Sequence, residues 1–260
     1  MLVFSGHDPT GGAGMVADVE AIRAQQGWPV TVPTALTVQD SRDVHAVYPV
    51  DPQVMAEQVH CIEQDMSLQA IKVGLVSSLE AITVIEQVCR RHPEVPVVID
   101  PVLKAGGGRE LSSDTLVDAF RERLLPLVTL LTPNHLELFR LAGTPDVDDA
   151  LHRIYRQGAE HVLVTGTDHA PLADRVVRHQ LYTGGNPVES WVWSRLPGQF
   201  HGSGCTLAAS CAVWLARGET VVSSCLLAQR YTWQTLDRSL QQGGGQAFPN
   251  RCPTEQESAS

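Results

Sequence analysis

Short apolar runs alternate with longer amphipathic stretches through most of this 260-residue chain. Apolar runs of about 4–8 residues are typical of buried strands, and apolar residues spaced three and four apart are typical of helices. The expected strands are Leu2–Ser5, Val30–Leu36, Ala70–Leu75, Val95–Asp100, Val128–Thr132 and His161–Thr165, and the expected helices are Gly14–Gln26, Pro52–Asp65, Leu79–Arg91, Ser113–Leu124 and Asp146–Gln157. This alternation predicts an α/β fold, with a mostly parallel sheet and helices on both faces.

Two segments interrupt the alternation. Val44–Val50 is expected as a short edge strand or a lid, and Thr183–Pro187 as the turn of a hairpin between Val176–Tyr182 and Glu189–Trp193. Two long helices are expected afterwards, over Ser203–Arg217 and Glu219–Gln241. The first is apolar on nearly all sides and is therefore expected to be deeply buried.

Composition excludes several classes of protein. The formal net charge of -10 argues against broad nucleic-acid binding. No apolar run approaches the roughly 20 residues of a membrane span, and the N-terminus lacks the features of a signal peptide, so we expect a cytoplasmic protein. The six cysteines form no C-x-x-C pair, so we expect free thiols and no zinc site. Residues 1–242 are expected as one domain, followed by a flexible tail at 243–260 that is rich in Gly, Pro, Ser and Gln.

Unusual residue clusters fall just after the expected strands. They are Gly6–Gly14, Thr37–Ser41, Asp100–Gly108, Thr132–Glu137, Thr165–Asp168 and Gln199–Cys205. In open parallel sheets, ligands bind beyond the carboxyl ends of the strands. The coincidence therefore indicates an enzyme with its site at that edge.

The sharpest cluster is His201–Leu207, which contains Gly202, Ser203, Gly204 and Cys205 directly before the apolar helix. Glycines let the backbone approach a ligand closely, and the first N–H groups of a helix have no partners within it. An anion is the natural occupant of such a helix start. A thiol in the first turn is expected to have a lowered pKa and to act as a proton acceptor. The alternative is a glycine-rich connector with a buried cysteine.

A second cluster, Asp8–Gly14, is followed by Asp18. Gly12–Ala17 matches the loose dinucleotide pattern G-x-G-x-x-G/A. We reject that interpretation because six residues separate the strand from the motif, and because it leaves the loop at Gly202 unexplained. Glycines opening onto a helix can equally hold a small polar substrate, with Asp18 accepting a hydrogen bond, or they can form a plain connector.

Two further clusters contain carboxylates. Asp100 closes an apolar strand, where it can hold hydrated Mg²⁺ or position a loop near phosphate, or simply cap a turn. Asn134 and Glu137 have the spacing of a capping box. The alternative places Asn134 and Glu137 near metal-bound phosphates.

These clusters, in this order, resemble the hydroxymethylpyrimidine/phosphomethylpyrimidine kinases of the ribokinase-like superfamily. The likeness covers about Leu2 to Gln241, and it is carried by the segments Ser5–Val19, Thr34–Ser41, Lys72–Leu75, Asp100–Leu103, Thr132–Glu137 and His201–Leu207. The resemblance implies a three-layer α/β/α sandwich and an enzyme that transfers phosphate from ATP, with Mg²⁺, to a small pyrimidine alcohol or its monophosphate. It also implies a homodimer.

The resemblance further implies roles for individual residues. Gly6, Asp18 and Gln39 would contact the pyrimidine, with Val102 against the ring. Cys205 would be the catalytic residue, and the amides of Gly202, Ser203 and Gly204 would form the anion hole. The nucleotide would lie at Asn134, Thr165 and Gly166, and the metal at Asp100 and Glu137.

The chain departs from the family pattern at the cluster Thr165–Asp168. Relatives usually carry a lysine near the phosphates where this chain has Thr165, although other ribokinase-like kinases use a Thr-x-Gly loop there. Asp40 also replaces the usual Asn. These departures leave open a pyridoxine or pyridoxal kinase, and a pyrimidine-binding relative without catalysis.

Overall fold

One nine-stranded sheet organises the chain in a computed structural model, which describes residues 1–103, 113–167 and 175–252. The strand order is β3-β2-β1-β4-β5-β6-β7-β8-β9. The strands are β1 (Leu2–His7), β2 (Val30–Gln39), β3 (Val44–Pro49), β4 (Ile71–Val73), β5 (Val97–Ile99), β6 (Leu130–Leu131), β7 (His161–Thr165), β8 (Val176–Thr183) and β9 (Asn186–Ser194). The strands from β2 to β7 in this order are parallel, while β3, β8 and β9 add antiparallel pairs at the two edges.

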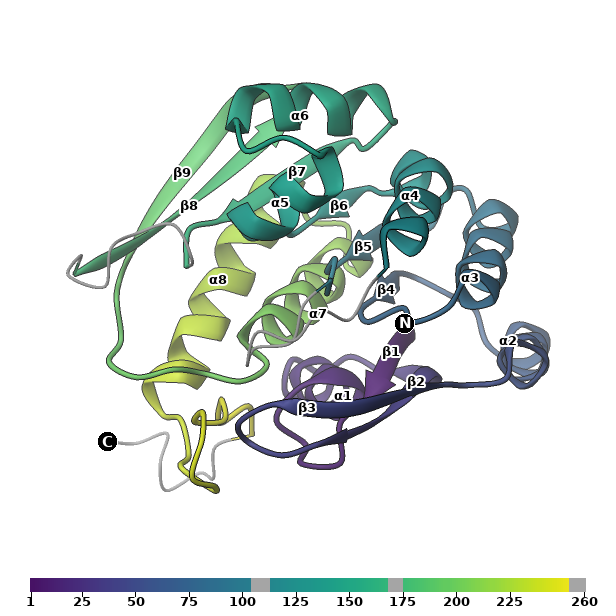
Figure 1. Ribbon diagram of the computed structural model, residues 1–260, viewed down its shortest axis with the longest axis horizontal. Coiled ribbons are helices and arrows are strands. Elements are labelled where there is room, and N and C mark those ends of the chain that lie inside the picture. The colour runs from purple at the N-terminus through teal and green to yellow at the C-terminus, as the bar shows by residue number, and fades with distance from the viewer. Residues whose placement is uncertain (104–112, 168–174, 253–260) are drawn as a thin grey trace.

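Helices cover both faces of this sheet (Figure 1). They are α1 (Gly14–Ala24), α2 (Pro52–Asp65), α3 (Leu79–Arg91), α4 (Asp114–Arg123), α5 (His135–Ala142), α6 (Val147–Arg156), α7 (Ser203–Ala216) and α8 (Val221–Asp237). Helices α1, α7 and α8 pack on one face, and α2 to α6 on the other. The expected three-layer, ribokinase-like α/β/α sandwich is thus confirmed.

Two apolar cores lie on the two faces, as the alternation of side chains along a strand requires. On β1, Leu2 and Phe4 belong to the core under α2 to α6, whereas Val3 belongs to the core under α7. Helix α7 is buried from Cys205 to Val213, which confirms the prediction from its apolar sequence. No helix in the described ranges is both long and apolar enough to cross a membrane.

Helix starts differ in how their first N–H groups are satisfied. The helices α2, α3, α4, α5, α6 and α8 each begin with a side chain that accepts a backbone N–H: Asp51, Ser78, Ser113, Asn134, Asp146 and Thr220. Helices α1 and α7 begin at Ala13 and Gly202 with no side-chain cap. The Ala13 amide before α1 donates to Asp8, whereas the first amides of α7 are available to a ligand.

The C-terminal segment differs from the expected flexible tail as far as the structure describes it. Residues 243–252 fold back against the body, where Phe248 pairs with Leu240 and Ala247 pairs with Phe200. The Arg251 side chain is almost fully buried, and its Nε donates to the Thr206 hydroxyl at 2.8 Å. Composition alone suggested disorder, but a buried arginine with several acceptors fixes this segment. Residues 253–260 lie outside the described part, as do 104–112 and 168–174, which hold Lys104, Gly106–Gly108 and Asp168.

Candidate active site

A cavity of about 900 Å³ lies along the carboxyl edge of the sheet. Most of the residues singled out from the sequence line it: Gly6, Gln39, Asp100, Val102, Asn134, Glu137, Thr165, Gly202, Ser203, Gly204 and Cys205. Asp18 and Gly166 do not. Five strands and the start of α7 therefore bring distant parts of the chain to one site, as the strand-end argument predicted.

The start of α7 forms the middle of this cavity. Gly202 has a left-handed backbone, with φ +87°, and a Cβ there would lie 2.0 Å from the Gly12 carbonyl oxygen. Only glycine therefore permits this approach of the two glycine-containing loops. The uncapped amides that follow, in Ser203 and Gly204, belong to residues that line the cavity. This arrangement suits an anion.

Cys205, in the first turn of α7, lies against a group of buried charges. The residue is 9% exposed, and its thiol lies close enough to the Asp100 carboxyl to lower the pKa of that group. Burial raises the pKa of the Cys205 thiol to about 12; Lys72 opposes this shift, while Asp100 and Asp18 reinforce it. The expected lowering of this pKa is therefore wrong, because loss of solvent and two nearby carboxylates outweigh the helix dipole.

Beneath Cys205, Lys72 and Asp18 form a fully buried ion pair, with 2.8 Å between Nζ and Oδ1. Burial alone would lower the pKa of Lys72, but Asp18 raises it above its ordinary value. Asp18 is thus enclosed by protein and does not face the cavity as a substrate contact would. Lys72 was not among the predicted site residues, although a lysine between Ile71 and Val73 in an apolar strand is a signal of a buried charge.

Asp100 lies next to this pair at the end of β5. Burial raises the pKa of its carboxyl to about 6, and Lys72 opposes the shift. The carboxylate packs against Gly204, since a Cβ on that residue would lie 3.4 Å from Oδ2. Asp100 and Cys205 therefore lie together beside the loop that contains Gly202 and Gly204.

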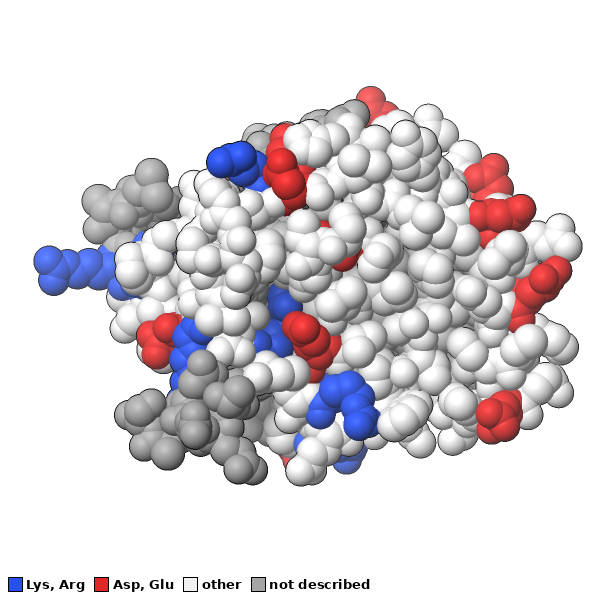
Figure 2. Space-filling model, turned by 90° about the horizontal axis from the view of Figure 1, so that it is seen from below, with Lys and Arg blue, Asp and Glu red and all other residues white. Residues whose placement is uncertain are grey.

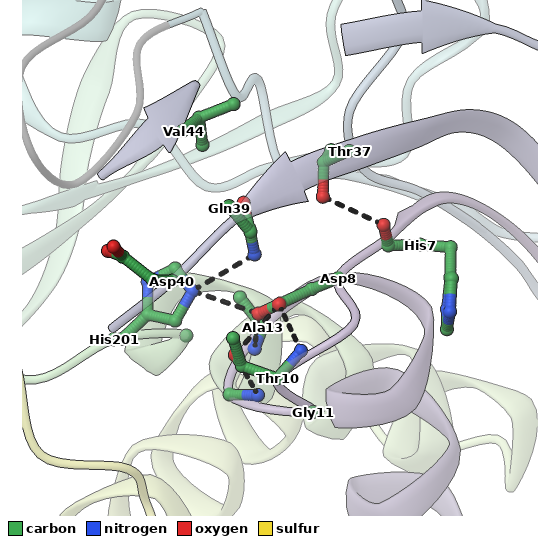
Figure 3. A network of polar contacts seen from close by, with 12 residues as sticks. His7, Asp8, Thr10, Gly11, Ala13, Thr37, Gln39, Asp40, Val44 and His201 are labelled. Carbon is green, nitrogen blue, oxygen red and sulfur yellow. Dashed lines mark hydrogen bonds and ion pairs between the residues drawn. The ribbon is translucent and has the colours of Figure 1, made fainter. Parts of the chain in front are cut away.

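The end of the cavity near β1 and β2 has a dense hydrogen-bond network (Figure 3). Buried Asp8 accepts from the Thr10 amide at 2.8 Å, the Thr10 hydroxyl at 2.7 Å and the Ala13 amide at 2.8 Å. His201 Nε2 lies 2.9 Å from Asp8 Oδ2 and 3.4 Å from Gln39 Nε2. Burial alone would raise the pKa of Asp8, but hydrogen bonds from His201, Gln39 and Thr10 hold it well below its ordinary range.

This network joins the two glycine-containing loops, and sequence analysis assigned no role to Asp8 or His201. Arg251 also connects the two loops. Its guanidinium group donates hydrogen bonds to the Thr206 hydroxyl and to the backbone carbonyls of Gly11 and Gly12. Both glycine-containing loops are consequently held by side chains from elsewhere in the chain. The signal in the sequence was the pair of loops itself, but their contact depends on tertiary packing.

The other end of the cavity lies at β6 and β7. Asn134 and Glu137 form the capping box of α5, so the structural interpretation of this pair is confirmed, although both residues also line the cavity. The Thr165 amide donates to the Pro133 carbonyl at 2.8 Å. Gly166 does not line the cavity. A Cβ on Gly166 would come within 2.1 Å of the Arg178 carbonyl oxygen.

His179 on β8 supports this end of the cavity. Its Nδ1 lies 3.3 Å from the Gly166 amide, which donates to it. Burial lowers the pKa of His179 to about 4, and the neighbouring His135 lowers it further. The ring is therefore neutral at physiological pH and acts as an acceptor.

Two further features concern the kind of ligand that the molecule could bind: clusters of metal-ligating side chains and the distribution of basic side chains on the surface. Within the described ranges, no cluster of three or more His, Cys, Asp or Glu side chains is placed to hold a metal ion by protein ligands alone. On the face shown in Figure 2, basic side chains occur in small separate groups rather than as one continuous patch. The cavity with its uncapped helix start is thus the feature that calls for a ligand.

Comparison with known proteins agrees with this geometry. A family model described as "Phosphomethylpyrimidine kinase" matches residues 8–250. Among curated relatives, the thiamine biosynthetic bifunctional enzyme TH1 of Arabidopsis thaliana is 31% identical over 92% of this chain and 47% of its own length. The hydroxymethylpyrimidine/phosphomethylpyrimidine kinase of Streptomyces coelicolor is 32% identical over 94% of this chain and 91% of its own.

A solved structure shares the fold. An ADP complex of Bacillus subtilis pyridoxal kinase has a TM-score of 0.83 and 27% identity, and the match covers 96% of each chain. The chain spans about half the length of the first three curated relatives that it matches, all described as bifunctional. Because the family model matches most of the chain, this protein belongs to the phosphomethylpyrimidine kinase family, whose members are phosphotransferases.

Proposed function

We propose that this chain transfers a phosphoryl group from ATP to 4-amino-5-hydroxymethyl-2-methylpyrimidine or to its monophosphate, a reaction of thiamine biosynthesis. The observation that carries the proposal is the uncapped start of α7, which opens with Cys205 and Asp100 into a cavity lined by Gly6, Gln39 and Asn134. The family match over residues 8–250 supports the same reaction class.

The acceptor is proposed to occupy the β1 and β2 end. Gly6, Gln39 and Val102 line this part of the cavity and offer a backbone surface, an amide and an apolar contact for a flat ring. Asp18 is buried with Lys72, so its proposed role changes from contacting the pyrimidine to supporting the site from below. The polar groups at this end are held by the Asp8–His201 contact.

Transfer is proposed to occur beside Cys205. Phosphoryl transfer depends more on positioning and charge stabilisation than on covalent chemistry. The amides of Gly202, Ser203 and Gly204 are proposed to stabilise the transferred group, as donors fixed before reaction do. The neutral Cys205 thiol, which lies beside the Asp100 carboxyl, is proposed to receive the proton of the acceptor hydroxyl as its own proton passes to that carboxylate.

Magnesium fits the donor set at the site. Mg²⁺ commonly uses one or two carboxylates together with substrate phosphates, and it neutralises charge on those phosphates. Asp100 and Glu137 both line the cavity. Their carboxylate oxygens are the proposed ligands, and the rest of the coordination shell would come from phosphate and water.

The nucleotide is proposed to lie at the β6 and β7 end, where Asn134 and Thr165 line the cavity. Gly166, which does not line the cavity, is proposed to fix the backbone of the loop after β7. The ADP complex of the similar pyridoxal kinase supports use of an adenine nucleotide. That similarity also favours a second candidate function, phosphorylation of a pyridoxal-type alcohol.

A panel of alcohols separates these functions. The chain would be incubated with MgATP and hydroxymethylpyrimidine, its monophosphate, pyridoxine or pyridoxal, and the products would be weighed by mass spectrometry. We expect the pyrimidine to gain one or two phosphates and to outcompete the pyridoxal compounds. Tight pyrimidine binding by calorimetry without any product would instead support a relative that has lost catalysis.

A homodimer is proposed as well. Gln39 and Thr37 of β2 line the cavity, and the alternate residues Leu36 and Val38 are each 50% exposed on the opposite face, beside Tyr48 at 60%. An exposed apolar group of this kind suits a second copy of the chain. Light scattering should report a dimer that Tyr48→Glu weakens; a monomeric wild-type chain would contradict this.

The proposed location is the cytoplasm. All six cysteines are free thiols, which suits a reducing compartment.

A further inference from the structure

Arg195 follows β9 at the same edge of the sheet as the proposed site. Strands β7 and β9 run in the same direction, because both are antiparallel to β8. Thr165, the last residue of β7, pairs with His179, and the β8–β9 hairpin continues for three more residue pairs, ending at Val176 and Ser194. The hairpin therefore extends roughly 10 Å past Thr165 and forms a wall of the cavity.

Contacts with α8 hold the end of this wall in place. The Trp233 indole N–H donates to the Ser194 carbonyl at 2.9 Å, and the Trp193 indole N–H donates to Gln229 Oε1 at 2.9 Å. The Arg195 amide continues the strand ladder by donating to the Arg175 carbonyl at 2.9 Å. The backbone that carries Arg195 is thus fixed on both sides.

Arg195 lines the cavity, and two nitrogens of its guanidinium group have no hydrogen-bond partner among the described residues. Nε and Nη2 are both buried, and neither makes a hydrogen bond within the described ranges. A buried guanidinium nitrogen without an acceptor is unfavourable. Arg140, the other arginine that lines the described cavity, pairs with Asp114 at 2.6 Å.

The unmet hydrogen-bonding capacity of Arg195 matches what the proposed reaction needs. A nucleotide brings several negative charges into a cavity that already contains Asp8, Asp100 and Glu137. Thr165 stands where relatives usually place a lysine, and its hydroxyl donates to the Pro133 carbonyl at 3.4 Å. The planar guanidinium group binds phosphate oxygens through paired N–H donors.

We infer that Arg195 binds the phosphates of the nucleotide and supplies the positive charge that Thr165 lacks. The inference rests on the proposed function and extends it to a further binding residue. The nucleotide is favoured over the acceptor's phosphate because Arg195 follows β9, at the far end of the strand order from β1 and β2. Gly6 and Gln39, the proposed acceptor contacts, come from those two strands.

The test is calorimetry on the full chain with MgADP, adenosine and hydroxymethylpyrimidine phosphate. The variants are Arg195→Met, Arg195→Lys and, as matched control, Arg178→Gln, which alters an exposed arginine of the same hairpin. We expect Arg195→Met to weaken MgADP about ten- to hundredfold and to leave the other two ligands within about twofold. The MgADP affinity of Arg195→Lys should lie between those of wild type and Arg195→Met, and the affinity of Arg178→Gln should match that of wild type.

Thermal unfolding without ligand tells binding from a structural role. Because the buried nitrogens of Arg195 have no partner in residues 1–103, 113–167 and 175–252, Arg195→Met should unfold at the same temperature as wild type or higher. An unchanged MgADP affinity in Arg195→Met overturns the inference alone. A parallel loss of adenosine binding, or a loss confined to the pyrimidine phosphate, overturns it too. A wild-type chain that neither binds MgADP nor phosphorylates any alcohol contradicts the proposed function itself.

Discussion

The two ends of the cavity differ in how completely their polar groups are satisfied. At the β1 and β2 end, Asp8 accepts from Thr10, Ala13 and His201, and its carboxylate is buried with every oxygen engaged. At the β7 and β9 end, two buried nitrogens of Arg195 have no acceptor in the described part of the chain. The polar groups at the β1 and β2 end are satisfied without a ligand, whereas the β7 and β9 end has unused hydrogen-bond donors for an anion.

This difference indicates a division of labour. A preorganised network fixes the shape of a site and favours one small ligand, because little order remains to be gained on binding. An unpaired cation instead favours a highly charged ligand, whose binding completes the hydrogen bonds. The start of α7, with Cys205 and Asp100, lies between the two ends and belongs to neither.

The largest effect is expected at the start of α7, between the two ends of the cavity. Cys205→Ala should reduce kcat about 10²- to 10⁴-fold, because it removes the proposed proton path to Asp100. The KM values for ATP and for the pyrimidine should change little, since neither end of the cavity is altered. Steady-state kinetics would check this, with Cys211→Ala, a buried thiol on the same helix, as control. A kcat within about tenfold of wild type would remove Cys205 from the mechanism.

The next largest effect concerns the buried charges below the acceptor end. Lys72→Met should lower the free energy of unfolding by about 3–5 kcal/mol, because it leaves Asp18 buried without a partner. The double variant Lys72→Met with Asp18→Leu should regain most of that loss. Urea denaturation measures both effects. Arg153→Met, which breaks an exposed pair with Asp149, should change stability by less than about 1 kcal/mol, and a loss as large as that of Lys72→Met would contradict this expectation.

A smaller effect concerns pH at the nucleotide end. The pKa of His179 is lowered from 6.5 to about 4, so its contribution to stability is complete above pH 6.5 and is lost as the pH falls toward 4. Between pH 7 and 4.5, wild type should lose about 2 kcal/mol more unfolding free energy than His179→Gln, which does not titrate. Identical pH profiles in urea denaturation would show that His179 titrates normally.

The smallest effect tests the preorganised end. His201→Ala should raise the KM for the pyrimidine about tenfold, because Asp8 and Gln39 lose a shared partner. The KM for ATP should remain within about twofold of wild type. His60→Ala, at an exposed position of α2, provides the matched control. An equal rise in both KM values would mean that the two ends are not separate.

The sequence predicted the fold well because its signals are local. The alternation of strands and helices and the placement of glycines after strands both follow from short-range pattern. The same reasoning located the start of α7 and the cavity around it. It also predicted a cap at Asn134, although α5 was not among the expected helices.

The remaining features depend on burial, which short-range pattern does not reveal. The pKa of Cys205 shifts opposite to its expected direction because folding buries the thiol away from water and, to a smaller extent, places Asp100 and Asp18 near it. Asp18 was expected to face a substrate and instead pairs with Lys72, which comes from a different strand. Arg251 and Arg195 resemble ordinary polar residues in the sequence, and only tertiary packing buries Arg251 and two nitrogens of Arg195.

The most direct test of this account is a crystal structure of the chain with MgADP and 4-amino-5-hydroxymethyl-2-methylpyrimidine. The account predicts the pyrimidine between Gln39 and Val102, with its hydroxymethyl group toward Cys205. It predicts the ADP phosphates beside Arg195 and the amides of residues 202–204. A nucleotide bound across Asp8 and His201, or a pyrimidine bound at the β9 end, would contradict the division of the cavity on which the account depends.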